Sequence, residues 1–240
     1  MRFAALARRN FLELWRDLLS LSLNVALPLA LLVVFQVFAQ FDDFFRPAAL
    51  TPGIVLFGLV MLMFSTAMTL ARDRETALFS RLLTAPLRSN DFVAAYSLPY
   101  LPAAIIQAAA IFGVGTLLGL EIKGNAGLVA LVLLTTAVLY IGLGMLAGAV
   151  FSHKTVPFAY TAVLLLTIFG GAWMDLDAVG GVLRAVGDLL PFARALDAAR
   201  DVIVDGAGFA AIAADFYWVV GYTVLVGALA VFVFRRRMRD

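Results

Sequence analysis

The chain has 240 residues, of which 63% are hydrophobic and only 14% are charged. Soluble domains carry about 25% charged residues, so this composition, with a mean hydropathy of +0.99, excludes a soluble globular protein and indicates an integral membrane protein. The absence of cysteine excludes a disulfide framework and thiolate chemistry, and the net charge of +2 is informative only once the basic residues are assigned to the two sides of a membrane.

The first 17 residues interleave four arginines with phenylalanine, leucine and tryptophan. This pattern predicts a basic amphipathic helix in the interface of an anionic leaflet. A secretory signal peptide is the alternative interpretation, but the apolar run 18–39 that follows is longer than the roughly 7–15 residues of a signal-peptide core. We therefore predict the first membrane span at 18–39.

Five further apolar segments are candidates for spans, each of which needs about 20 residues. Thr51 and Pro52 predict the start of the second span, because threonine caps helices and proline suits the first helical turn. Pro99 and Pro102 predict that the third span begins with an interfacial portion and then bends. The predicted spans two to six are 51–71, 92–120, 126–151, 156–174 and 216–234.

The segment 175–215, between predicted spans five and six, differs in composition because it contains seven aspartates. Its apolar residues form two amphipathic patterns, 182–190 and 192–203, which Pro191 separates. Neither pattern is long enough to cross a membrane. We predict two short interfacial or re-entrant helices at the outer mouth of the bundle.

The distribution of basic residues predicts the orientation. A cytoplasmic N-terminus leaves only five of the 18 lysines and arginines outside, and an even number of spans then returns the C-terminus to the cytoplasm. Segment 72–91 consequently faces the cytoplasm, and segment 175–215 faces out. The five outer residues are Arg46, Lys123, Arg184, Arg194 and Arg200.

Segment 72–91 interrupts two strongly apolar stretches and contains a short amphipathic pattern. Leu78, Phe79, Leu82 and Leu83 form one helical stripe, and Pro86 ends any helix just before it. The pattern fits a helix that lies flat in the lipid interface, and it also fits a docking element for another protein. From the residues alone, the interfacial helix is the favoured interpretation.

Several kinds of chemistry have no support in the sequence. No acidic or basic residue lies inside a predicted span, which argues against an ion-driven carrier. Neither lysine follows a glycine, so the phosphate-binding GxxxxGK[ST] motif is absent and any ATP must be bound by a partner. His153 is the single histidine, and we interpret it as a loop residue rather than a pH sensor or ligand. No set of residues has metal-binding spacing.

Two features inside the spans have open interpretations. The small-residue pairs Gly115…Gly119 and Gly144…Gly148 could mark close helix crossings or a dimer seam. Scattered polar residues could line a transport pathway, or they could hydrogen-bond between helices. The candidate pathway residues are Asn24, Gln36, Gln107 and Thr161.

The run 74–87, RETALFSRLLTAPL, resembles the signature of type-2 ATP-binding-cassette (ABC) transporter permeases. That signature has an Arg-Glu, a small pair that is often Gly-Thr, a Leu-Leu and a Thr-x-Pro in the first cytoplasmic loop. Here Thr76-Ala77 stands where Gly-Thr is common. The layout of the whole chain, from a basic amphipathic N-terminus through six spans, also resembles the family.

The resemblance implies an all-α membrane protein with one transmembrane domain at 1–240. That domain would comprise a connecting helix at 1–17, six spans, a coupling helix in the cytoplasmic loop 72–91 and two short outer helices in the extracytoplasmic loop 175–215. It implies a permease subunit of an exporter in the inner (plasma) membrane, with both termini cytoplasmic. The cargo would be an amphipathic, drug-like, lipid or glycan substrate.

The resemblance also implies partners. Two copies of a cytoplasmic ABC ATPase would bind ATP and Mg²⁺, and a second permease chain would complete a homo- or heterodimer in contact with membrane lipids. No cofactor in this chain, no catalytic residue and no nucleic acid is expected. Docking then outranks interfacial packing for segment 72–91. The expected ATPase-coupling residues are Arg74, Glu75, Thr76, Ala77, Leu78, Phe79, Arg81, Leu82, Leu83 and Pro86.

Two other functions are compatible with parts of the sequence. An intramembrane or interfacial metal-dependent enzyme could use Asp197, Asp201 and Asp205, since the first two would share a helix face. Solvated loop charges explain the same aspartates more simply. The other alternative is a non-ABC membrane scaffold or channel that works without any ATPase.

Overall fold

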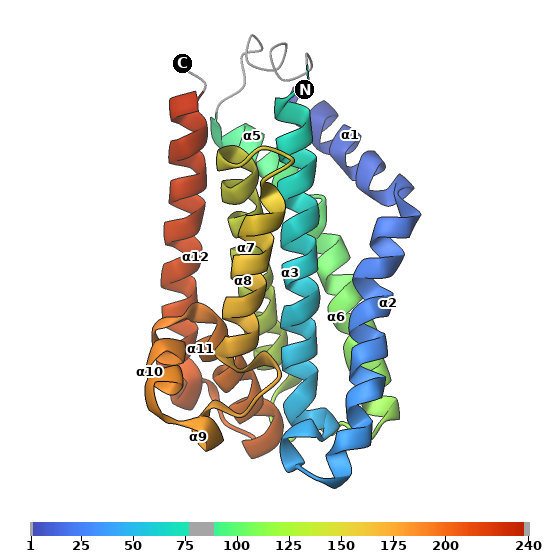
Figure 1. The fold of residues 1–240 in the computed structure, drawn as a ribbon, viewed down its shortest axis with the longest axis vertical. Coiled ribbons are helices and arrows are strands. Elements are labelled where there is room, and N and C mark those ends of the chain that lie inside the picture. The colour runs from blue at the N-terminus through green and yellow to red at the C-terminus, as the bar shows by residue number, and fades with distance from the viewer. Residues whose placement is uncertain (1, 77–88, 238–240) are drawn as a thin grey trace.

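The computed structural model describes residues 2–76 and 89–237, and all regular structure in these ranges is helical (Figure 1). The α-helices are α1 (Arg2–Arg16), α2 (Leu18–Phe35), α3 (Pro47–Arg74), α5 (Ser89–Ser97), α6 (Tyr100–Leu117), α7 (Ala126–Val150), α8 (Val156–Thr167), α9 (Leu176–Val179), α10 (Gly181–Leu189), α11 (Pro191–Arg200) and α12 (Phe209–Arg237). Short 3-10 helices η1 (Gln36–Gln40) and η2 (Asp43–Phe45) follow α2, and π-helical turns η3 (Ile168–Ala172) and η4 (Asp201–Asp205) follow α8 and α11.

Five helical segments of the described chain are long and apolar enough to cross a membrane. They correspond to five of the six predicted spans. The remaining predicted span, 156–174, forms a shorter apolar helix at Val156–Ala172, so the count of six stays a prediction. The membrane segments are Leu18–Gln40, Pro47–Arg74, Asp91–Leu117, Ala126–Val150 and Phe209–Arg236.

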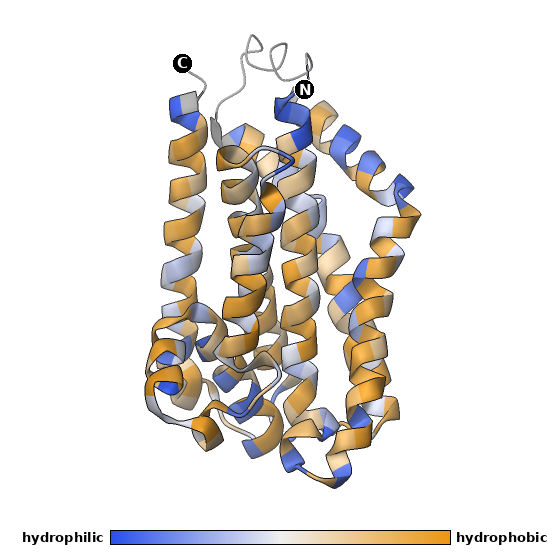
Figure 2. Ribbon diagram, in the orientation of Figure 1, coloured by the Kyte–Doolittle hydropathy of each residue, from blue (hydrophilic) through white to orange (hydrophobic). Residues whose placement is uncertain are grey.

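Helix α3 is the centre of the bundle, with α7 and α8 on one side of it and α2 and α6 on the other (Figure 1). Within the described structure, 72% of its apolar window is buried, against 17% for the windows of α2 and α12. Figure 2 shows apolar residues along the length of the helices and hydrophilic residues gathered mainly at the two ends of the bundle.

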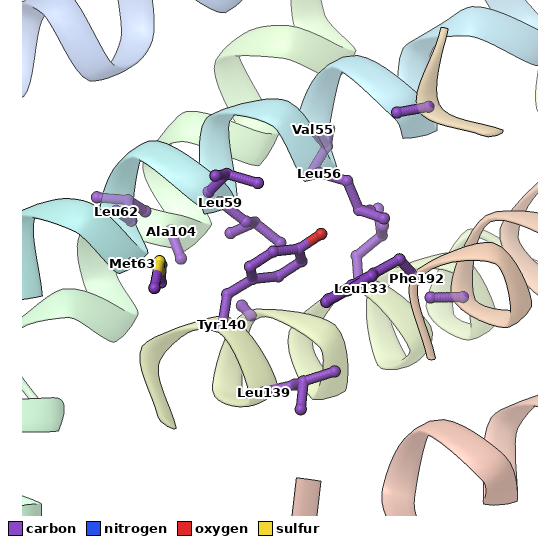
Figure 3. Packing of buried hydrophobic residues seen from close by; sticks show 14 of the residues in the cluster. Val55, Leu56, Leu59, Leu62, Met63, Ala104, Leu133, Leu139, Tyr140 and Phe192 are labelled. Atoms are coloured by element: carbon purple, nitrogen blue, oxygen red, sulfur yellow. The ribbon is translucent and has the colours of Figure 1, made fainter. Parts of the chain in front are cut away.

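In the core between α3 and α7, the Tyr140 hydroxyl lies among aliphatic side chains (Figure 3). This hydroxyl lies 2.7 Å from the hydroxyl of Thr167, so its hydrogen-bonding capacity is used. The Tyr140 ring stacks on Phe192 of α11 with ring centroids 5.1 Å apart. Tyr140 therefore connects α7 to both α8 and α11.

Two glycines of α7 allow this helix to lie directly against α3. A Cβ atom on Gly144 would lie 2.5 Å from the carbonyl oxygen of Met63, and one on Gly148 would lie 2.7 Å from that of Ala67. The interpretation of Gly144…Gly148 as a close helix crossing is therefore correct, and the crossing lies within one chain. The pair at 115 and 119 is different, because Gly119 has a φ of 98° and ends α6.

Gly144→Ala is expected to destabilise the protein, because its Cβ would contact backbone that cannot move independently of α3. Overpacking of this kind costs about 1–3 kcal/mol. Gly227→Ala on α12 is the matched control, since nothing lies within 4 Å of its Cβ position, and alanine there should stabilise the helix by about 0.5–1 kcal/mol. Thermal unfolding in detergent measures both; a shift of the same sign for the two variants would contradict the packing argument.

The starts of α3 and α12 differ from the predicted ones. Helix α3 begins at Pro47, so Thr51 is not a cap; its hydroxyl donates to the carbonyl of Pro47 at 2.6 Å. The predicted bend near Pro99 is confirmed by the break between α5 and α6. Helix α12 begins at Phe209 rather than 216 and includes Asp215, whose charge Arg194 neutralises at 2.7 Å.

The two predicted short helices near 182–203 are confirmed as α10 and α11, with Pro191 in the first turn of α11. Helix α9 was not predicted. Helix α11 lies toward the end of the bundle opposite the chain termini (Figure 1) and is packed into it, because Phe192 and Leu196 are buried. Its last residue, Arg200, donates from Nε to the carbonyl of Ala49 and from Nη2 to that of Gly171, both at 2.9 Å.

Candidate functional site

Both ends of the described chain lie at the same end of the bundle, which we call the terminal end (Figure 1). Helix α3 ends here, and α5 begins here. The predicted coupling residues Arg74, Glu75 and Thr76 are at the terminal end. The others lie outside the described residues, so their docking role stays a prediction; they are Ala77, Leu78, Phe79, Arg81, Leu82, Leu83 and Pro86.

A buried carboxylate joins three helices at this end. Asp73, near the C-terminus of α3, is 6% exposed. Arg9 of α1 donates to both of its oxygens, at 2.7 and 3.1 Å, and the Tyr96 hydroxyl of α5 donates to it at 2.6 Å. The paired geometry strengthens such a contact, and the hydrogen bond to Asp73 raises the pKa of Arg9. We call Arg9, Asp73 and Tyr96 the Asp73 node.

Neighbouring contacts extend the Asp73 node to α12. The Asn10 side-chain amide donates to the carbonyl of Ala95 at 3.2 Å. The ring of Phe92 lies 4.8 Å from that of Tyr96 and 4.5 Å from that of Phe234, measured between centroids. The predicted amphipathic helix at 1–17 is therefore confirmed as α1, and its polar residues bind the last turn of α5 and the end of α3.

The last residues of α3 also hold the turn between α7 and α8. The guanidinium of Arg74 donates to the carbonyl of Gly148 at 2.6 Å, which satisfies a carbonyl at the end of α7. The Glu75 carboxylate accepts the backbone N–H of His153 at 3.0 Å and also pairs with His153 Nδ1. We call the Glu75–His153 contact the latch. Two of the predicted ATPase-coupling residues thus bind the chain's own backbone.

The interpretation of His153 as a loop residue is confirmed, because it lies in the turn between α7 and α8, but it also pairs with Glu75 there. Its partner, Glu75, is 78 residues away in the sequence, so no local pattern could indicate the pair. Asp73 was missed for a related reason, because Arg9 is 64 residues away. The one available signal was a lone aspartate close to the end of a long apolar segment, where burial requires a cation.

The latch is expected to depend on pH through Glu75. The backbone N–H of His153, followed by its side chain and by Lys154, lowers the pKa of Glu75 below the ordinary 4.5. A carboxylate with a lowered folded-state pKa stabilises the folded form above the unfolded pKa, and loses this effect as pH falls through the lowered value. The latch should therefore be formed above about pH 4.5 and open as the pH falls through the lowered pKa of Glu75.

Hydrogen exchange measures this opening directly, because the His153 amide is itself a latch donor. Its protection factor should fall in acid in the wild type and be low at every pH in Glu75→Ala. The Thr155 amide, which donates to the carbonyl of Ser152 at 2.9 Å, is the internal control. Equal protection of the His153 amide in both proteins would show that the latch does not form.

Of the predicted pathway residues, the structure brings two together. Asn24 and Gln107 line a cavity of about 60 Å³ between α2, α3 and α6, together with Trp15. Asn24 donates to the Ser65 hydroxyl at 3.3 Å. Gln107 is 1% exposed, and neither atom of its amide has a hydrogen-bond partner in the described structure. The other two are elsewhere: Gln36 and Thr161 donate to the carbonyls four residues before them, at Leu32 and Pro157.

The structure gives no support to the metal-dependent enzyme. Asp197 forms an ion pair with Arg184 at 3.1 Å, and Asp205 is exposed at the end of η4. In residues 2–76 and 89–237, no group of three or more histidine or acidic side chains is placed to hold a metal ion. Asp197 and Asp215 instead form ion pairs between helices.

Comparison with known protein families gives a match that covers most of the chain. No curated protein matches the chain. The family model described as ABC-2 type transporter matches residues 1–204, from α1 through the outer helices into η4. This match includes the Asp73 node, the latch and the undescribed segment between α3 and α5, so the chain belongs to the ABC-2 type transporter family and is a membrane-embedded transport subunit.

Proposed function

We propose that the chain is the permease subunit of an ATP-driven exporter in the inner (plasma) membrane. Two copies of a cytoplasmic ATPase hydrolyse ATP, and two permease chains enclose the pathway for an amphipathic drug-like, lipid or glycan cargo. The family match supports this function. The position of both chain ends at the terminal end agrees with two cytoplasmic termini.

The observation that carries the proposal is the convergence of contacts on the last turn of α3. Asp73 binds α1 and α5, while Arg74 and Glu75 bind the turn after α7. The chain continues from Glu75 into the predicted coupling helix. Force on that helix is therefore delivered to a point where four helices are tied together by short polar contacts, and the helices move as a unit.

This arrangement divides the predicted coupling residues into two groups. Arg74 and Glu75 are positioning residues that fix the end of α3. The apolar stripe of Leu78 and Leu82 is the surface that enters a cleft of the ATPase. Substitution of Arg74 and Glu75 should weaken the transmission of movement from the coupling helix to the bundle. Substitution of Leu78 and Leu82 should abolish binding of the ATPase.

The double variant Leu78→Asp with Leu82→Asp tests the proposal. It should abolish co-purification with the partner ATPase and reduce ATP-dependent transport in vesicles by more than about tenfold, because each buried leucine contributes about 1.5–3 kcal/mol. The matched variant His153→Ala should keep the ATPase bound. Unchanged binding and transport in the double variant, or transport by the purified chain without any ATPase, would contradict the proposal.

A further inference from the structure

A wholly apolar groove runs between α6 and α7 where both helices pack on α3. Its volume is about 370 Å³. Val55 and Leu59 of α3 form part of its base, and Ala104 and Leu133 flank them (Figure 3). Small side chains on both walls leave the space open, and these are Ala104, Ala108, Ala109, Ala126, Ala130 and Ala137.

The groove has a defined depth. It begins at Ile122, in the turn between α6 and α7, and reaches Ala137 of α7. From Ala126 to Ala137 the helix rises by about 16 Å at about 1.5 Å per residue. The hydrocarbon core of a bilayer is about 30 Å thick, so the groove extends through one leaflet, the one opposite the terminal end.

The mouth of the groove carries charge and is held in place. Lys123 and Glu121 are exposed on either side of Ile122. The turn is fixed to η4, because the backbone N–H groups of Lys123 and Gly124 donate to the carbonyls of Ile203 and Val202 at 3.0 Å. An ammonium group at this level can bind a phosphate as a point charge.

We propose that this groove binds one acyl chain of a membrane phospholipid, whose phosphate lies beside Lys123. The walls belong to membrane segments, so the surrounding solvent is hydrocarbon, and Ala109 and Ala130 are exposed to it. Lipid hydrocarbon in the groove provides the dispersion contacts that its lining would otherwise lack. The site goes beyond the transport function, because it requires neither the ATPase nor the cargo.

Photo-crosslinking in nanodiscs tests the proposal. The probe is a phosphatidylcholine with a diazirine on one acyl chain, and adducts are mapped by mass spectrometry. Adducts per exposed residue should be at least about fivefold more frequent on 104–112 and 126–137 than on 224–229 of α12, since a bound chain stays in contact whereas annular lipid exchanges. Equal labelling of these segments would overturn the site.

Variants that fill the groove sharpen the test. Ala109→Leu with Ala130→Leu adds bulk at two exposed positions and should reduce groove adducts by about tenfold, which is about 1.4 kcal/mol of binding. Ala228→Leu, at an exposed alanine of α12, should not change groove labelling.

Lys123→Gln should lower groove labelling by at least about twofold, through loss of the phosphate contact. Unchanged labelling in the double variant would overturn the acyl-chain site, and unchanged labelling in Lys123→Gln would overturn the phosphate contact.

Disulfide formation distinguishes a lipid in the groove from a second copy of the chain. Because the chain contains no cysteine, Ala109→Cys introduces a unique thiol inside the groove. Lipid occupancy predicts monomers after mild oxidation in native membranes. Disulfide-linked dimers would show that a second copy of the chain covers the groove, and would overturn the proposal.

Discussion

Asp73→Ala is expected to lower the free energy of unfolding by about 3 kcal/mol, because it leaves a guanidinium and a buried tyrosine hydroxyl without their shared acceptor. The loss should be accompanied by uncoupling, with ATPase still bound and ATP-dependent transport reduced by more than about tenfold. Denaturant titration in mixed micelles and vesicle transport assays measure the two effects separately.

An exposed ion pair provides the matched control for this experiment. Arg46 and Asp43 are joined at 2.7 Å, the same distance as Arg9 and Asp73, but their side chains are 65% and 81% exposed. Asp43→Ala should therefore change stability by no more than about 1 kcal/mol. The double variant Arg9→Leu with Asp73→Leu should lose less than the sum of the single variants. Equal effects of Asp43→Ala and Asp73→Ala would refute a structural role for burial at the node.

Arg200→Leu is expected to have the second-largest effect, at about 2–4 kcal/mol, since each hydrogen bond from a charged donor contributes about 1.5–3 kcal/mol. Its guanidinium joins α11 to Ala49 near the start of α3 and to Gly171 in the π-helical turn, and it lies 4.8 Å above the Phe44 ring. Burial lowers the pKa of Arg200 to about 10, so the group stays charged at neutral pH.

Hydrogen exchange should locate this effect. In Arg200→Leu, amides of 47–53 and 168–172 should exchange faster, while those of α5 should not change. Arg200→Lys should be intermediate, because an ammonium cannot present two donors in the fixed geometry of a guanidinium. An unfolding temperature for Arg200→Leu within about 1 °C of wild type would contradict the predicted loss, which corresponds to several degrees in a chain of this length.

The sequence was sufficient to predict helices and helix breaks that depend on neighbouring residues. The alternation of arginine and apolar residues identified α1, and the prolines at 99 and 191 identified the breaks before α6 and α11. Hydrophobic runs located five of the membrane segments. Periodicity and proline geometry act within one or two turns of chain, so a single sequence contains all the information that these assignments need.

The features that required the structure are contacts between distant residues. Asp215 appeared to be a loop residue because a carboxylate is unfavourable in an apolar helix, yet Arg194 compensates its charge inside α12. The contacts of Arg74 with the end of α7 and of Glu75 with the α7–α8 turn could not be predicted either, because these partners are more than 70 residues away in the sequence. The charge of each residue was visible in the sequence, whereas the identity of its counterpart depended on tertiary packing.

The short length of α8 has a consequence for the surrounding bilayer. Val156–Ala172 rises by only about 25 Å at about 1.5 Å per residue, which is less than the hydrocarbon thickness of about 30 Å. Helix α10 lies against its far end and presents Val182, Val186 and Leu189 outward. If this helix crosses the membrane, as the sequence predicts, lipid tails beside it must shorten or tilt, and we expect the protein to favour thinner bilayers.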